Sequence, residues 1–274
     1  MPQDTNLKQY YTSFKYQLLG YIKTKRFIGL TLFSLIVSIA VILLMFHVEY
    51  TTLKDSNSPT FFLNYLDTSL LDIIVVVGSF FGGDLISGDV GTGSAYYILV
   101  QPVKRSVLFL GKYTAALLSS FFIVFLYILV GIFASIDLYG KVTSKVALSL
   151  GLVLLMVAAT IMLASFFSSI FKSPTSGMIT SIVLLILVFP IITGIIGSLE
   201  GIYPIEFLTF AGEITYLIFN TKYPATKTVS PALPGLKIYT FNPALYQGIE
   251  SLLIYLIVFG IISIVVYSRR QIEG

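Results

Sequence analysis

The sequence of 274 residues contains no cysteine, no tryptophan and a single histidine, and only 11% of its residues are charged. Without cysteine the chain can form no disulfide, no thiolate metal site and no cysteine nucleophile. The lone His47 is a poor basis for a metal site. A soluble domain carries about 25% charged residues, so this chain has too little charge to cover a globular surface.

Hydrophobic residues make up 56% of the chain, and its mean hydropathy is +0.92. Such values are typical of a protein that crosses the membrane several times. In the absence of tryptophan, 18 tyrosines and 22 phenylalanines supply the aromatic side chains for the membrane interfaces. The formal net charge of +4 comes from lysines and arginines beside apolar blocks. Because they form no single basic face, we expect no nucleic-acid partner.

The apolar blocks predict an all-α polytopic membrane protein that forms one transmembrane domain with six transmembrane helices. Residues 27–46 are twenty residues without a charge, which at a rise of 1.5 Å per residue span the ~30 Å hydrocarbon core. The start of the second span is either Phe61 or Ser69, because Asp67 and Asp72 interrupt its apolar run. The six expected spans are residues 27–46, 61–83, 107–136, 146–171, 176–197 and 249–267.

Residues 4–25 precede the first span and have apolar residues at three- and four-residue spacing, with lysines between them. This pattern predicts an interfacial helix whose lysines face anionic lipid headgroups. The alternative is a merely solvated helix. Membrane lipids are therefore an expected partner.

Residues 198–247 are rich in proline and glycine, and their apolar runs are too short to cross a membrane. We expect an extracellular, helical segment between spans five and six, with one or two short helices. Glu200, Glu206 and Glu213 form either a solvated face of this segment or a gate or cation site. Pro190 and Gly194 predict a bend before it, at an outer gate or only to accommodate the segment.

The lysines and arginines set the expected orientation, because cytoplasmic loops carry an excess of them. With the N-terminus inside, eleven of the seventeen lie on the cytoplasmic side and six outside. We therefore expect both termini to be cytoplasmic. The scarcity of histidine and the lack of cysteine and tryptophan fit the plasma membrane of a prokaryote.

The stretch between spans two and three, residues 84–106, is polar and glycine-rich and falls on the basic side. A short cytoplasmic helix between two spans passes any force applied to it to both, so we expect this region to be a coupling helix on which a motor protein docks. A phosphate-binding loop is absent. Gly111-Lys112 is the only near match, but Ser106 stands in place of the first glycine and Tyr113 follows the lysine. Energy must then come from a partner, from an ion gradient, or not at all.

The order of residues in this stretch resembles the permeases of ABC-2 type transporters, and the resemblance extends over the whole six-span architecture. The matching positions are Asp84, Ile86, Ser87, Gly88, Asp89, Gly91-Thr92, Pro102-x-x-Arg105 and Gly111-Lys112. Val90 and Gly93 depart from the usual pattern. Asn242-Pro243 before the sixth span is similar to an element of the branch that includes the nitrous-oxide-reductase maturation permease.

The resemblance implies a membrane-spanning permease subunit of an ATP-binding cassette transporter, an exporter that works by alternating access. It implies a second permease copy, in a homodimer or pseudo-dimer, and a cytoplasmic ABC ATPase subunit. The chain itself is then no enzyme and binds no cofactor, and ATP and Mg belong to the partner subunit. The implied docking and coupling residues are Asp84, Ile86, Ser87, Gly88, Asp89, Gly91, Thr92, Pro102 and Arg105.

Asp72 is a carboxylate inside a span, where a charge is costly and marks a functional candidate. It lines a substrate path, or it is a structural aspartate that is hydrogen-bonded or reaches toward the interface. An ion-coupled secondary transporter that uses Asp72 for proton coupling is the alternative function. A third class is a non-transporting assembly factor or intramembrane enzyme. The sequence does not specify the substrate.

Overall fold

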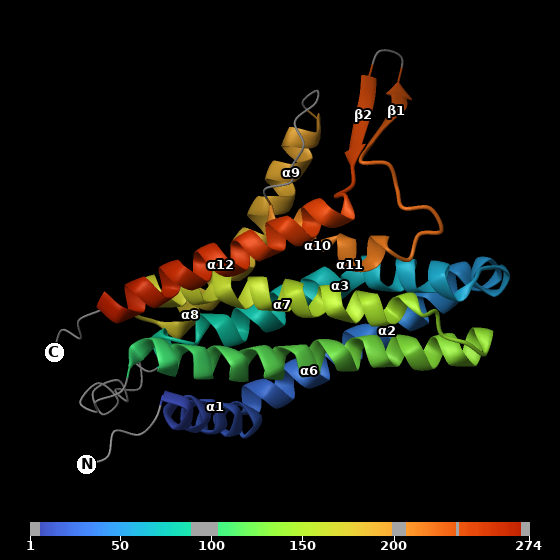
Figure 1. Cartoon of the computed structure of the whole chain (residues 1–274). Helices are drawn as coiled ribbons and strands as arrows, with labels where there is room; N and C mark the ends of the chain where they lie inside the picture. The colour runs from blue at the N-terminus through green and yellow to red at the C-terminus, as the bar shows by residue number, and fades with distance from the viewer. Residues whose placement is uncertain (1–5, 89–103, 199–206, 234–235, 270–274) are drawn as a thin grey trace.

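The computed structural model describes residues 6–88, 104–198, 207–233 and 236–269. Six helical segments are long and apolar enough to cross a membrane, as expected (Figure 1). They are α2 (Lys25–Asp55), α3 (Ser58–Gly83), α6 (Arg105–Tyr139), α7 (Lys145–Ile170), the continuous run α8 (Pro174–Val183), η1 (Leu184–Val188) and α9 (Phe189–Ser198), and α12 (Leu245–Arg269). The all-α polytopic fold class is confirmed.

Helices α3 and α7 form the centre of the bundle. Two-thirds of the apolar window of α7 is buried (67%), against 11% for the run from α8 to α9. Gly82 makes the close approach possible, since a Cβ there would lie 2.7 Å from both the carbonyl oxygen of Ile161 and the Cβ of Ala164. A Cβ at Gly78 would likewise lie only 2.8 Å from the side-chain methyl carbon (Cγ2) of Thr160. Gly78 and Gly82 are four residues apart, the small-xxx-small spacing that lets two membrane helices approach closely.

The second span begins earlier than either expected start. The side chain of Asn57 accepts a hydrogen bond from the backbone N–H of Thr60 at 3.1 Å, and Pro59 stands in the first turn. Both features start a helix, so α3 begins at Ser58. Asp67 and Asp72 consequently both lie well inside one helix.

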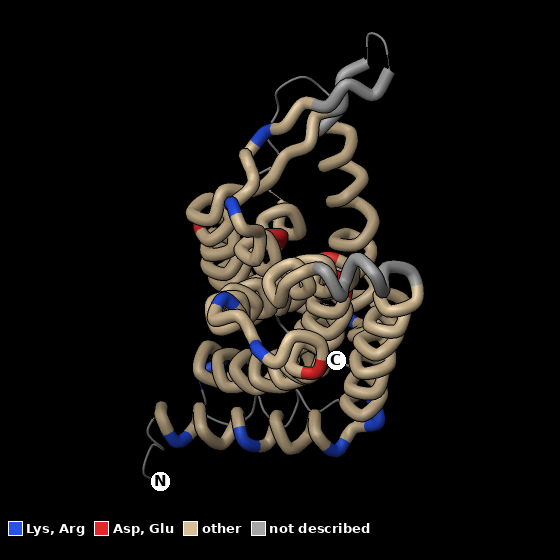
Figure 2. Tube along the Cα trace, turned by 90° about the vertical axis from the view of Figure 1, so that its right-hand side faces the viewer, with Lys and Arg blue, Asp and Glu red and all other residues tan. Residues whose placement is uncertain are grey.

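Helix α1 (Asn6–Ile22) confirms the helix expected near the N-terminus. It lies along α6 at the edge of the bundle, where several lysine and arginine positions follow it (Figures 1 and 2). The hydroxyl of Tyr10 donates to that of Thr114 at 2.9 Å, and Ser13 donates to the Leu108 carbonyl at 3.1 Å. Gly111 allows this contact, because a Cβ there would lie 2.8 Å from the Cβ of Ser13.

The fifth span bends through a π-turn. The backbone N–H of Phe189 bonds the carbonyl of Leu184, five residues back. Pro190 follows and has no N–H to continue the regular ladder. The sequence correctly marked Pro190 as the place of the bend, and α9 departs from the bundle beyond it (Figure 1).

The segment between spans five and six is only partly helical, which corrects the expectation of a helical segment. The short helices α10 (Leu208–Gly212) and α11 (Ile214–Leu217) are followed by an antiparallel hairpin of β1 (Lys227–Leu233) and β2 (Leu236–Phe241). The strands are rich in β-branched and aromatic residues, which favour extended structure. Asn242 closes the base of the hairpin: it follows β2, and its side-chain amide donates to the carbonyl of Ala225, just before β1, at 3.0 Å.

Candidate functional site

The predicted coupling region begins, at its N-terminal end, with the turn that follows α3. The hydroxyl oxygen of Ser168, near the end of α7, accepts the backbone N–H groups of Ile86 and Ser87 at 3.0 and 2.9 Å. The Ser87 hydroxyl donates to the carbonyl of Gly83 at 2.8 Å. Ile86 and Ser87 are fully buried. Their position fixes the turn to α7 and leaves no surface of theirs for a partner.

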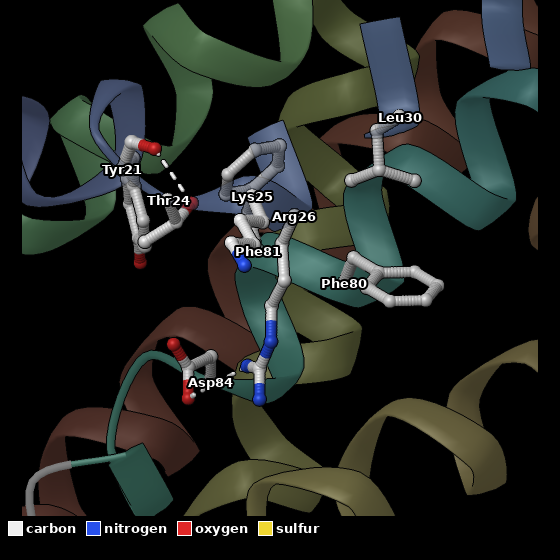
Figure 3. A pocket seen from close by; sticks show the side chains of 8 residues that line it. All are labelled: Tyr21, Thr24, Lys25, Arg26, Leu30, Phe80, Phe81 and Asp84. Carbon is white, nitrogen blue, oxygen red and sulfur yellow. Dashed lines mark hydrogen bonds and ion pairs between the residues drawn. The ribbon is translucent and has the colours of Figure 1, made fainter. Parts of the chain in front are cut away.

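Asp84 is at the surface of the same turn. Its carboxylate lies 3.9 Å from the guanidinium of Arg26 in the first turn of α2, an ion pair across two spans (Figure 3). Gly88 gives the carboxylate room, because a Cβ at Gly88 would lie 2.6 Å from Asp84 Oδ1. Asp84 thus joins the end of α3 to the beginning of α2.

The C-terminal end of the coupling region is the start of α6, where Arg105 is the first helical residue. Its Nη1 donates to the backbone carbonyls of Tyr267 and Ser268 at 3.2 and 2.9 Å. These carbonyls belong to the last turn of α12, where unpaired carbonyls carry a partial negative charge. Arg105 therefore couples the start of the third span to the end of the sixth.

Gly111 and Lys112 lie within α6 and are buried, against α1 at Gly111. The two residues are part of a regular helix, so their backbone cannot form a phosphate-binding loop. The motif serves helix packing instead.

Four of the predicted site residues lie outside the described ranges: Asp89, Gly91, Thr92 and Pro102. Both chain segments that flank them, at Ser87 and at Arg105, are held by helices other than their own. The structure therefore brings α7, α2, α12 and α1 to the two ends of the predicted docking segment. Its role in docking stays a prediction.

Sequence reasoning missed Arg26 and Ser168 as partners of this region. A signal was present for Ser168, since three serines gather between residues 165 and 169 at the end of an apolar span. For Arg26 the charge alone suggested headgroups, and only the fold places it beside Asp84.

A second group of polar residues lies at a cavity of about 340 Å³ between α3, the run from η1 to α9, and α10. Its lining includes Asp72, Pro190, Thr193, Gly194 and Glu213. Asp67 and Asp72 are both exposed in the chain by itself, as are Asn64 and Thr68. Asn64, Thr68 and Asp72 follow one another at four-residue spacing and Asp67 adjoins Thr68, so the four share one polar face of α3. A polar face within a span faces water or protein instead of lipid tails.

Glu213 joins this cavity from the segment between α10 and α11. Burial, and secondly the nearby Asp67 carboxylate, raise the pKa of Glu213 to about 8. Burial of the Tyr216 side chain, together with the nearby charges of Glu213 and Asp67, raises the pKa of Tyr216. Glu213 is half-buried and lines the same cavity as Asp72, so it is not part of a freely solvated face. Glu200 and Glu206, the other two members of the expected face, lie outside the described residues. Over the described residues, no group of three or more histidines or acids could hold a metal ion.

The chain matches the family described as ABC-2 family transporter protein over residues 11–272. No curated protein sequence matches it significantly. The family match covers all six spans, the outer segment and both ends of the coupling region. Permeases of this family are membrane transport subunits without an ATPase domain of their own, and they generally work with a cytoplasmic ATPase subunit. This chain therefore belongs to the ABC-2 family and is a multi-pass permease subunit of an ABC transporter.

Proposed function

We propose that this permease is an exporter subunit that works as a dimer by alternating access, driven by an ATPase subunit docked on the segment of residues 84–105, with the buried Ile86 and Ser87 anchoring the segment instead of contacting the ATPase. The main support for the proposal is that both ends of this segment are bonded to helices far away in the sequence. Displacement of the segment would act on α7 through Ser168, on α2 through Asp84 and on α12 through Arg105. ATP and Mg²⁺ would bind the partner subunit.

The proposed orientation places both termini and the docking segment in the cytoplasm of a prokaryote. Its support is the excess of lysine and arginine at that end of the bundle. The hairpin and the short helices α10 and α11 would then face the outside. Membership of the nitrous-oxide-reductase maturation branch stays a proposal that rests on Asn242-Pro243.

The proposed substrate path runs along the polar face of α3 toward the cavity at Asp72. That cavity lies beside the π-turn and Pro190, where the fifth span bends. Irregular helices of this kind often occur at functional sites. A second copy of the chain would close the exposed side of the polar face, since α3 presents carboxylates there that cannot face lipid.

The docking proposal predicts that Asp89→Arg prevents co-purification with the ATPase subunit. A reversed charge within a docking surface repels the complementary group, which costs several kcal/mol. The measurement is the recovery of the ATPase on affinity-tagged permease. The matched control, Asp55→Arg, makes the same change at the end of α2 away from the segment and should keep full recovery. Equal recovery with both variants would rule out docking at residue 89.

The raised pKa of Glu213 predicts a pH-dependent stability. The unfolded chain titrates this group near 4.5 and the folded chain near 8, so the folded state binds more protons between these values. Stability should therefore fall as pH rises from about 5 to 8, by an amount on the order of a few kcal/mol. Thermal unfolding of the purified permease between pH 5 and 9 measures it. Glu213→Gln should flatten the profile; an unchanged slope would contradict the assignment.

A further inference from the structure

A cavity of about 400 Å³ lies where the turn between α1 and α2 meets the end of α3 (Figure 3). It shares no lining residue with the cavity at Asp72, and it touches the docking segment only at Asp84. The side chains that decide its chemistry are Thr24, Lys25, Arg26, Leu30, Phe80 and Asp84.

The rim of this cavity is cationic. Lys25 and Arg26 both line it and are exposed, and among the described residues at the cavity Asp84 is the one acid. The Arg26 side chain is 58% exposed, and its closest approach to Asp84 is 3.9 Å, longer than a direct hydrogen bond. A guanidinium has five N–H donors, so Arg26 can bind a further anion. The rim suits a phosphate group.

The inner wall of the cavity is apolar. Leu30 and Phe80 come from the parts of α2 and α3 that lie inside the predicted spans. Ile22 and Ile28, within three residues of Lys25 in the sequence, expose 47% and 55% of their surface. Charge at the edge of the bundle and apolar surface toward its middle match a molecule with an anionic head and a hydrocarbon tail.

We propose that this cavity binds one anionic phospholipid, with the phosphate between Lys25 and Arg26 and an acyl chain along Leu30 and Phe80. A free phosphate would gain nothing from the apolar wall. The neighbouring exposed isoleucines favour lipid tails, because apolar side chains beside lysines are the pattern of a membrane-interface surface.

Binding at this cavity also affects the docking segment. The lipid phosphate competes with the Asp84 carboxylate for Arg26, and Asp84 lies in the turn that begins the segment. An anionic lipid would therefore loosen the link between α2 and the turn. This consequence rests on the proposed function, whereas lipid binding itself does not and is measured on the permease alone.

Native mass spectrometry of the full-length permease, titrated with phosphatidylglycerol in detergent, tests the site. The unaltered chain should retain one tightly bound lipid. Near a membrane surface each cation contributes enough that Lys25→Gln with Arg26→Gln should weaken this binding about 30-fold. Asp84→Asn removes the carboxylate that competes with the lipid phosphate for Arg26, so it should increase the affinity for the lipid several-fold. The two variants thus move affinity in opposite directions, so a folding defect cannot imitate both results.

The matched control is Lys8→Gln with Lys15→Gln, which removes two exposed cations of α1 away from the cavity. It should leave the tight lipid in place. Equal weakening in both double variants would show diffuse attraction to lipid and overturn the site. Glycerol phosphate at the same concentration should not displace the lipid; displacement would show a site for free phosphate esters. Full retention of phosphatidylcholine would also refute the proposal, since it carries no net negative charge.

Discussion

Arg105→Ala is expected to reduce ATP-driven transport about tenfold while the ATPase subunit stays bound. The variant loses two hydrogen bonds from a charged guanidinium to the last turn of α12. A hydrogen bond to a charged group contributes about 1.5–3 kcal/mol, and 1.4 kcal/mol corresponds to a factor of ten. The bond to Ser268 is solvent-exposed and contributes little, so the expected loss is about that of one such bond. The start of α6 would still move with the docking segment, but α12 would no longer follow it. The measurement is the amount of substrate transported per ATP hydrolysed in reconstituted vesicles.

Two variants make the Arg105 result specific. Lys104→Ala removes the neighbouring exposed cation and should leave the ratio of transport to ATP hydrolysis unchanged. Arg105→Lys keeps the charge but loses the planar, multi-donor guanidinium, so it should restore coupling only in part. If Lys104→Ala uncouples as strongly as Arg105→Ala, the link to α12 is not the cause.

Gly82→Val is expected to destabilise the whole bundle. An added side chain would collide with the backbone carbonyl of Ile161, which cannot rotate away, and with Ala164. Overpacking of a core costs about 1–3 kcal/mol, and a clash with backbone lies at the upper end of that range. The expected result is a lower unfolding temperature in detergent and loss of the folded protein on gel filtration.

Gly151→Val is the matched control, because no atom outside the local helix backbone lies within 4 Å of the position a Cβ would take there. Gly82 lies in the last turn of α3 and Gly151 in the second turn of α7, so the intrinsic cost of valine to the helix is no smaller at Gly151. Similar losses of stability in the two variants would mean that the packing of α3 against α7 does not depend on Gly82.

The architecture could be predicted from the sequence because spans are specified by length and hydropathy. The proline at position 190 also marked the bend of the fifth span. The start of α3 was harder, since Asp67 and Asp72 resembled a boundary. A local cap at Asn57 outweighed them, and the two carboxylates are tolerated inside the helix because they share its polar face.

The hairpin of β1 and β2 was missed because its strands are short and adjoin proline and glycine, as loops do. Glu213 was misjudged for a different reason. Its burial depends on the packing of α10 and α11 near α3, which no local pattern records. The same holds for the site: motif spacing identified Arg105 but not its partner, because the carbonyls of Tyr267 and Ser268 are 162 and 163 residues away.

The most direct test of this account uses the natural absence of cysteine. Gly91→Cys and Lys141→Cys each provide a single thiol, in the docking segment and at the opposite end of the bundle. In vesicles of known orientation a membrane-impermeant maleimide should label Cys at position 91 only from the cytoplasmic side, and the ATPase subunit should protect it. The thiol at position 141 should react only from outside, with or without the ATPase. Labelling of position 91 from outside, or labelling that the ATPase does not reduce, would contradict the docking mechanism.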